Sequence, residues 1–172
     1  MYERILVPID GSVTSGLGLS EAIRMAKLTG GRLRLVHVID DLSFSLAMDA
    51  YSGYAGNLLE ELRVDATKLL EAARASAADN GIEADTVLLD RFKSTVADQI
   101  IAEAQASKAE LIVIGTHGRR GISHWVMGSS AERILRISPV PVLLVRAPES
   151  AKSEHEHKHE HFTLPSGMLA SQ

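Results

Sequence analysis

Five short apolar runs recur along the first 145 residues of this chain, and they constrain its fold more than any other feature of the sequence. Branched residues dominate these runs, which are Ile5–Ile9, Leu33–Ile39, Thr86–Leu89, Leu111–Ile114 and Val140–Val145. Several of them are nearly continuous instead of alternating with polar residues, which is typical of strands buried on both faces of a parallel sheet. The runs therefore predict five strands of an α/β protein.

Between the runs, apolar residues follow the spacing of helices. The stripes run from Leu19 to Ala26, from Leu59 to Ala77, from about Thr95 to Ala106, and from Ser129 to the residues before Pro139. Thr29-Gly30-Gly31 ends the first helix and Asn80-Gly81 ends the second, as is common after the last turn of a helix. Strands and helices that alternate in this order predict a parallel sheet with right-handed crossovers and with helices on both faces.

Two segments do not follow this alternation. Residues 40–57 form a long connection rich in serine and glycine, which we expect to be a lid, an interface element or a mobile loop. We place the domain at residues 1–146 and a His/Glu-rich, low-complexity tail at residues 147–172, which we expect to be disordered. Alternating histidines in the tail (His155, His157, His159 and His161) could converge on a divalent metal. The Glu and Lys residues between them favour a solvated segment, and we assign no metal site.

The composition narrows the classes of function. A net charge of −4 argues against nucleic acid as a partner, because duplex binding requires a basic surface. The chain has no cysteine, which excludes disulfides, thiolate metal sites and thiol nucleophiles. It also lacks a signal peptide and any apolar stretch of about 18 residues. These features predict a soluble, cytoplasmic protein that does not bind membranes.

A glycine motif follows the fourth apolar run. Gly115-Thr116-His117-Gly118 is separated by nine residues from Gly128-Ser129-Ser130, which opens the last amphipathic stretch. A strand, a glycine loop and a helix N-terminus in this order present backbone N–H groups to phosphate oxygens. Glycine is needed where the main chain must approach a ligand closely or adopt a positive φ. The motif predicts a nucleotide-binding site.

Three motifs together resemble the universal stress protein family. They are Arg4-Ile5-Leu6-Val7-Pro8-Ile9-Asp10-Gly11-Ser12, then Gly115-x2-Gly118-x9-Gly128-Ser129, which is similar to the ATP-binding signature of one branch of that family, and finally Val140-Pro141-Val142-Leu143-Leu144-Val145. The resemblance covers residues 1 to about 146. It implies a doubly wound, adenine-nucleotide alpha-hydrolase-like fold with strand order 3-2-1-4-5. In such a sheet the nucleotide lies across the carboxyl ends of the central strands.

The same resemblance implies a role for each residue of the motifs. Asp10 would accept hydrogen bonds from ribose hydroxyls, Pro8 and Ile9 would flank the adenine, and the backbone of Val38 would bind its edge. Gly115 and Gly118 would bring the loop against ribose and phosphates. The phosphate tail would be held by Gly128, Ser129 and Ser130. Within the loop, His117 could contact phosphate or a metal-bound water, and Arg119 could neutralise phosphate charge.

Most of these residues also have a purely structural interpretation. Asp10-Gly11-Ser12 is ordinary turn chemistry. Ser129 and Glu132 have the spacing of a capping box. His117, Arg119 and the neighbouring Arg120 could be exposed loop residues, and Trp125 is expected to pack the loop against the helices.

Three functions of different classes remain open. The first is an ATP-binding regulatory module of the stress response, with ATP and possibly Mg²⁺ bound, that contacts an unidentified protein partner. The second is a slow ATPase or nucleotide phosphotransferase. The third is a dimeric interaction or chaperone-like protein with a vestigial pocket. No P-loop and no Gly-x-Gly-x-x-Gly sequence follows the first strand, and no catalytic residue is assigned.

The last apolar run predicts self-association. With strand order 3-2-1-4-5, Val140–Val145 lies at the edge of the sheet, and Val142 to Val145 carry no charge that would discourage pairing. We therefore expect a homodimer in which two such strands pair about a twofold axis, as the family resemblance also implies. The alternative is that the tail folds back over this edge.

Overall fold

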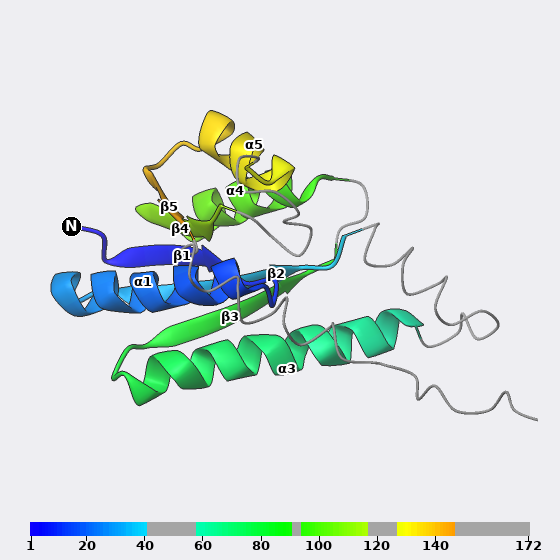
Figure 1. Cartoon of the computed structure of the whole chain (residues 1–172), viewed down its shortest axis with the longest axis horizontal. Coiled ribbons are helices and arrows are strands. Elements are labelled where there is room, and N and C mark those ends of the chain that lie inside the picture. The colour runs from blue at the N-terminus through cyan, green and yellow to red at the C-terminus, as the bar shows by residue number, and fades with distance from the viewer. Residues whose placement is uncertain (41–57, 91–93, 117–126, 147–172) are drawn as a thin grey trace, which may run out of the picture.

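The computed structural model describes residues 1–40, 58–90, 94–116 and 127–146, in which strands and helices alternate (Figure 1). The elements are β1 (Arg4–Pro8), α1 (Val13–Thr29), β2 (Arg32–Val38), α3 (Leu58–Asp79), β3 (Ala84–Leu89), α4 (Val96–Ala106), β4 (Leu111–Gly115), α5 (Ser129–Ile137) and β5 (Val142–Val145). Within these residues, no helix is both long and apolar enough to cross a membrane.

The strands form one parallel sheet in the order β3-β2-β1-β4-β5, which confirms the predicted strand order. The last strand begins at Val142 and not at Val140 as predicted. The carbonyl of Pro141 already accepts a bond from the Ile112 N–H at 3.0 Å, but Pro139 and Pro141 have no N–H to donate to a ladder. Regular pairing with β4 therefore begins only after the second proline.

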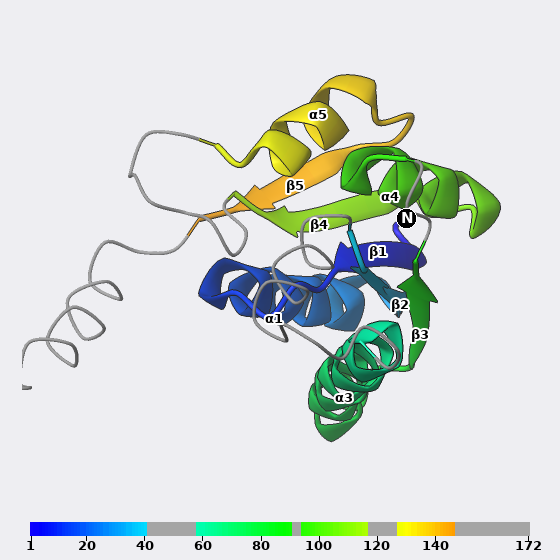
Figure 2. The same cartoon turned by 90° about the vertical axis from the view of Figure 1, so that its right-hand side faces the viewer.

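The sheet is covered by helices on both faces, as predicted. Figure 2 shows α1 and α3 below the sheet and α4 and α5 above it. Alternate residues of the strands point to opposite faces and form two apolar cores. The core under α1 and α3 contains Val7, Leu35 and Val113. The core under α4 and α5 contains Leu6, Val36 and Ile112. Because both faces are buried, the central strands carry the continuous apolar runs seen in the sequence.

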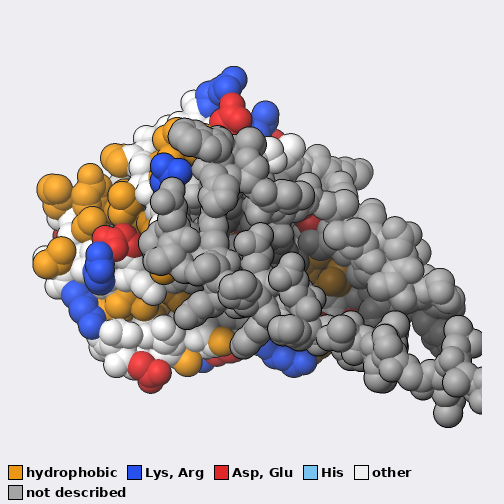
Figure 3. Space-filling view, in the orientation of Figure 1, with side chains coloured by type: hydrophobic (Ala, Val, Ile, Leu, Met, Phe, Trp, Pro, Cys, Tyr) orange, Lys and Arg blue, Asp and Glu red, His pale blue; other side chains and the backbone are white. Residues whose placement is uncertain are grey.

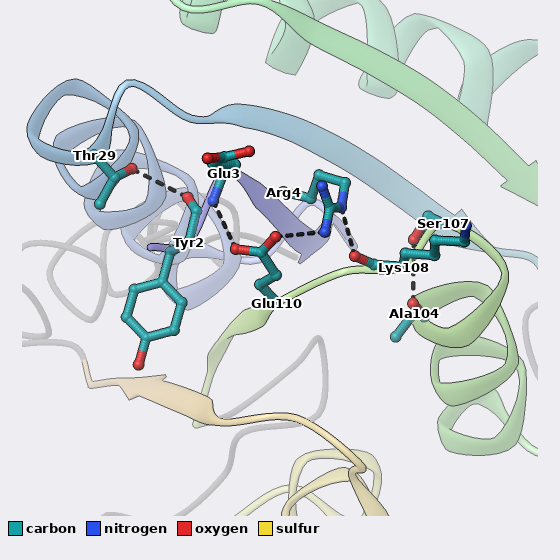
Figure 4. Close-up of polar contacts among 8 residues, drawn as sticks. All are labelled: Tyr2, Glu3, Arg4, Thr29, Ala104, Ser107, Lys108 and Glu110. Atoms are coloured by element: carbon teal, nitrogen blue, oxygen red, sulfur yellow. Dashed lines mark hydrogen bonds and ion pairs between the residues drawn. The ribbon is translucent and has the colours of Figure 1, made fainter.

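Polar contacts fix the amino edge of the sheet (Figure 4). Glu110 pairs with the Arg4 guanidinium and accepts a bond from the Glu3 N–H at 3.0 Å, while Arg4 Nε donates to the Lys108 carbonyl at 2.7 Å. The bond from the Glu3 N–H holds the pKa of Glu110 below its usual value, and the charge of Arg4 adds to the effect. These contacts join the start of β1 to the turn between α4 and β4, at the end of the molecule opposite the glycine motif.

Candidate functional site

The carboxyl ends of β1 and β4 lie side by side at one edge of the sheet, where α1 and α5 also begin (Figures 1 and 2). From β1 the chain builds the sheet in one direction through β2 and β3, and then returns to the other side of β1 with β4 and β5. Parallel sheets bind ligands in the crevice at such a reversal of strand order. The topology therefore places the candidate site at the ends of β1 and β4.

The turn from β1 to α1 is held by a set of short-range hydrogen bonds. The Asp10 N–H donates to Ser15 Oγ at 3.1 Å, and Asp10 Oδ1 accepts from the Ser12 N–H at 2.9 Å. Gly11 has a φ of +82°, a conformation that L side chains rarely adopt. The side chain of Ser12 then caps α1 by accepting from the Ser15 N–H at 3.1 Å. Asp10 thus has the structural role of a turn residue, and it lies half-buried at the candidate site.

Pro8 and Ile9 lie at the end of β1, on opposite faces of the sheet. The side chain of Ile9 is 5% exposed and belongs to the core under α1 and α3. Pro8 is half-buried and is the last residue of β1 that pairs with β2. A ligand at this edge would therefore meet Ile9 chiefly through its backbone.

Val38 presents its backbone to the space beyond the end of β1. The Val36 carbonyl accepts from the Ile9 N–H at 2.8 Å, whereas the Ile39 N–H donates to Leu89 of β3 at 2.8 Å. Successive residues of a strand direct their N–H and C=O groups to opposite neighbours, so the peptide groups of Val38 point to the same side as those of Val36. Pairing with β1 ends at Pro8 and Val36. The N–H and C=O groups of Val38 therefore point to the space beyond the end of β1.

Gly115 has a packing role that the sequence did not reveal. A Cβ at this position would lie 2.8 Å from the carbonyl carbon and 2.8 Å from the carbonyl oxygen of Thr14 in the first turn of α1. Across the same contact, a Cβ on Gly18 would lie 3.4 Å from the Gly115 nitrogen. The glycine at the end of β4 is thus required for the close approach of α1, whether or not a ligand is bound.

The two halves of the glycine motif are joined at their base. The Thr116 N–H donates to the Val145 carbonyl, and the Thr116 carbonyl accepts from the Gly128 N–H, each at 2.9 Å. The N–H of Gly128 is therefore already used inside the protein. Donors for an anion come instead from the next residues, Ser129 and Ser130, whose N–H groups have no acceptor within the helix because they lie in its first turn.

The capping-box interpretation of Ser129 and Glu132 is wrong. The helix begins at Ser129, its N-cap is Gly128, and no side chain bonds to this cap. Glu132 therefore lies one residue beyond the position that a capping box requires, and it pairs with Arg136 at 2.8 Å. Ser129 is exposed and Ser130 is half-buried at the start of α5.

Several predicted residues lie outside the described part of the chain and are grey in Figure 3. These are His117, Gly118, Arg119, Arg120 and Trp125, together with most of the 40–57 connection and the tail from residue 147. The described residues contain no group of three or more His, Cys, Asp or Glu side chains that could hold a metal ion. The site that the structure does describe consists of the ends of β1, β2 and β4 and the start of α5.

Two side chains at this edge were missed in the sequence. Ser15 is buried in α1 and bonds to the N–H of Asp10. His37 is 6% exposed in β2, with its Nδ1 2.6 Å from the carbonyl oxygen of Ile9. The only signal for His37 in the sequence is an imidazole within the apolar stretch from Leu35 to Ile39.

Comparison with known proteins identifies the family. The model of the universal stress protein family matches residues 1–146. The universal stress protein YxiE of Bacillus subtilis is 28% identical over 151 residues, which span 85% of this chain and 100% of the relative. The universal stress protein MJ0531 of Methanocaldococcus jannaschii is 30% identical over 150 residues, which span 87% of this chain and 85% of the relative.

Solved structures share the fold. A protein of the universal stress protein family from Burkholderia pseudomallei has a TM-score of 0.67 at 30% identity, over 85% of this chain and 97% of the other. The universal stress protein of Archaeoglobus fulgidus in complex with dAMP has a TM-score of 0.60 at 23% identity, over 84% of this chain and 98% of the other. A universal stress protein in complex with cAMP has a TM-score of 0.61 at 21% identity, over 84% of this chain and 97% of the other.

These likenesses confirm the adenine-nucleotide alpha-hydrolase-like fold that the sequence predicts. The sheet described above has the strand order 3-2-1-4-5 that the family resemblance implied. Together with the matches in sequence, they show that this chain belongs to the universal stress protein family.

Proposed function

We propose that this protein is an ATP-binding regulatory module of the stress response, in which the bound nucleotide alters contacts with a protein partner. One observation carries the proposal. The peptide edge of Val38, the carboxylate of Asp10 and the first turn of α5 all lie at the carboxyl edge of the sheet, at its reversal of strand order. These groups match the three parts of an adenine nucleotide, which are a flat base with donors and acceptors, a ribose and an anionic tail.

Each part of the nucleotide has a proposed contact. Val38 binds the edge of the adenine through its backbone, Asp10 accepts from the ribose hydroxyls, and the N–H groups of Ser129 and Ser130 bind phosphate. His117, Gly118 and Arg119 remain predicted phosphate contacts, and Mg²⁺ would accompany the phosphates. The relatives solved with cAMP and with dAMP support an adenine nucleotide as the class of ligand.

The first test is thermal unfolding of protein that has been shown to be free of nucleotide. ATP at about 100 times its dissociation constant should stabilise the fold by roughly 2.7 kcal/mol and raise the midpoint. GTP is the matched control, because it has the same phosphates and sugar but a different base edge, and it should give a smaller shift. An unchanged midpoint at millimolar ATP, with or without Mg²⁺, would contradict ATP binding and favour the vestigial-pocket alternative.

Phosphate release separates binding from turnover. We assign no catalytic residue, so bound ATP should be released intact after long incubation. Release of phosphate at a rate that changes with substitutions at Asp10 would instead support a slow ATPase or phosphotransferase.

We also propose that the protein is a homodimer that pairs through β5. This strand forms one edge of the sheet, and its four residues, Val142–Val145, are uncharged. Leu135 and Ile137 at the end of α5 are 47% and 40% exposed, respectively. An isologous partner would cover this edge.

A further inference from the structure

His37 is a buried imidazole at the carboxyl end of β2. It is 6% exposed and lies opposite Leu88 of β3, on the face of the sheet that α1 and α3 cover. Its Nδ1 is 2.6 Å from the carbonyl oxygen of Ile9. A carbonyl oxygen can only accept a hydrogen bond, so Nδ1 must carry the proton. The contact therefore assigns the proton of a neutral His37 to Nδ1 and not to Nε2.

The bond from His37 takes the place of a backbone hydrogen bond between β2 and the end of β1. In a regular parallel pair, the bond from the Ile9 N–H to Val36 would be followed by one from the Val38 N–H to the Ile9 carbonyl. Among the described residues, the first of these bonds is present at 2.8 Å, but the Ile9 carbonyl is bonded by the His37 ring and not by the backbone of β2. The Val38 N–H thus stays directed to the space beyond β1.

The peptide group between Ile9 and Asp10 is held at both of its polar atoms. His37 donates to its oxygen at 2.6 Å, and Ser15 Oγ accepts from its N–H at 3.1 Å. A peptide group is planar, so two such bonds fix its orientation and with it the position of the Asp10 Cα, from which the side chain leaves the main chain. His37 therefore acts on the two groups proposed to bind the nucleoside, which are the Val38 backbone and the Asp10 carboxylate.

We propose that His37 is a positioning residue of the nucleotide site, which orients the Ile9–Asp10 peptide and keeps the Val38 N–H available for adenine. The proposal rests on the proposed function. An apolar residue in place of His37 would leave the Ile9 carbonyl without this donor, and the turn could recover a bond by moving Ile9 towards the Val38 N–H. That movement would occupy the Val38 N–H, which is the proposed donor to adenine, and would turn Asp10 away from the ribose.

The protonation of His37 can be measured without nucleotide. In protein labelled with ¹⁵N-histidine, two-bond ¹H–¹⁵N correlation spectra distinguish a protonated ring nitrogen from an unprotonated one, and the signals of His37 are those lost in His37→Asn. We expect a protonated Nδ1. An unprotonated Nδ1 would overturn the proposal, because that nitrogen could not donate to Ile9.

Three substitutions then test the positioning role by titration calorimetry. In His37→Asn the amide nitrogen lies close to the place of Nδ1 and can still donate to Ile9, whereas Gln extends beyond it and Leu has no donor. We expect His37→Asn to bind ATP within about threefold of the parent, and His37→Gln and His37→Leu to bind at least tenfold more weakly, all three being folded by circular dichroism and cooperative melting.

Comparing AMP with ATP distinguishes a loss of the nucleoside contacts from general damage to the site. Because His37 acts on the nucleoside contacts, His37→Leu should weaken AMP and ATP by the same factor, so that the ratio of their dissociation constants stays that of the parent. Equal ATP affinity in the parent and in His37→Leu would overturn the proposal, as would failure of His37→Asn to restore binding. If the parent itself binds no adenine nucleotide, the proposed function fails and the positioning role fails with it, whereas the proton on Nδ1 is established independently by the spectra.

Discussion

Among single residues, Gly115 shows how a residue can belong to a ligand motif and to the packing of the fold at once. Its lack of a side chain lets the first turn of α1 come against the end of β4. The turn at Asp10 leads from β1 into this first turn of α1. The contact between α1 and Gly115 therefore sets the distance between the ends of β1 and β4, which form the candidate site. A substitution at Gly115 must therefore be judged by stability before it is judged by binding.

Gly115→Ala should destabilise the protein by about 1–3 kcal/mol, because its Cβ would lie 2.8 Å from the Thr14 main chain, which cannot move without shifting α1. Gly16→Ala is the matched control. A Cβ at Gly16 meets nothing within 4 Å, so alanine there should stabilise α1 by about 0.5–1 kcal/mol. Urea unfolding of the two variants measures both effects. Equal stability of Gly115→Ala and the parent would show that the main chain adjusts freely at this contact.

Asp10→Asn should weaken ATP binding while leaving the turn intact. The amide oxygen of asparagine can still accept from the Ser12 N–H, so the bond seen at 2.9 Å in the parent is kept and only the charge is lost. Loss of charge-assisted bonds to ribose hydroxyls should cost about 1.5–3 kcal/mol. Calorimetry with ATP and with 2′,3′-dideoxy-ATP should show the loss for the first nucleotide only. An equal loss for both would mean that Asp10 does not contact the sugar.

Among secondary-structure elements, α4 and α5 are tied together at the carboxyl edge by Asp98. This residue lies in the first turn of α4, accepts from Thr95 Oγ1 at 2.8 Å, and accepts from Arg133 of α5 at 3.1 and 2.9 Å. The bond from Thr95 and then the contact with Arg133 hold the pKa of Asp98 below its usual value. The link positions the helix whose first turn is proposed to bind phosphate.

The lowered pKa of Asp98 predicts a loss of stability in acid. A carboxyl group whose pKa is lower in the folded protein stabilises the fold above its unfolded pKa, and this contribution disappears as the pH falls through the folded pKa. The difference in melting temperature between the parent and Asp98→Asn should therefore be constant near neutral pH, begin to shrink below about pH 4, the ordinary value of an aspartate, and vanish once the pH lies below the lowered pKa of Asp98. A difference that persists at pH 2 would show that the charge of Asp98 is not its source.

The elements themselves were largely predictable from the sequence, because burial of the sheet on both faces imposes continuous apolar runs. The start of α1 could not be predicted from the sequence. The sequence stripe begins at Leu19, but the helix begins at Val13, and its buried first turns carry Thr14, Ser15 and Gly18 where an apolar stripe would be expected. These residues are small because α1 approaches Gly115 closely there, and such a contact between distant parts of the chain leaves no local pattern.

The candidate site was predictable only in part, for the same reason. Asp10, Gly115 and Gly128 stand in local motifs, so their positions at the carboxyl edge followed from the strands. The use of the Gly128 N–H by Thr116 depends on how the end of β4 meets the start of α5, and the bond from His37 to Ile9 depends on the pairing of β2 with β1. Neither bond could be deduced from spacing along the chain. The predicted contacts of His117, Gly118 and Arg119 lie outside the described residues and stay predictions.

For the whole molecule, the outer edge of β5, which no described strand pairs with, is the feature that bears on assembly. The carbonyls of Pro141 and Val145 accept bonds from Ile112 of β4 and from Thr116 directly after it, so alternation along the strand turns the peptide groups of Val142 and Leu144 outward. An antiparallel partner strand would pair with these outward groups. They can be changed without breaking a bond to β4.

Leu144→Pro should convert the proposed dimer into a folded monomer, because it removes an outward N–H while every inward bond of β5 remains. Leu144→Ala is the matched control, since it shortens the same side chain but keeps the N–H, and it should remain dimeric. Sedimentation at tens of micromolar protein measures the assembly, and circular dichroism checks folding. A monomeric parent, with or without ATP, would contradict pairing through β5.

The hydrogen bond between Thr116 and Gly128 has a consequence for how this domain can diversify. It joins the main chain at both ends of the segment 117–127, and Thr116 is itself bonded to Val145. A segment anchored in this way can be lengthened, shortened or exchanged during evolution as a unit, because its two attachment points belong to the sheet and to the first turn of α5. Under the proposed function, a different insert would give the same scaffold a new ligand preference with no change to its core.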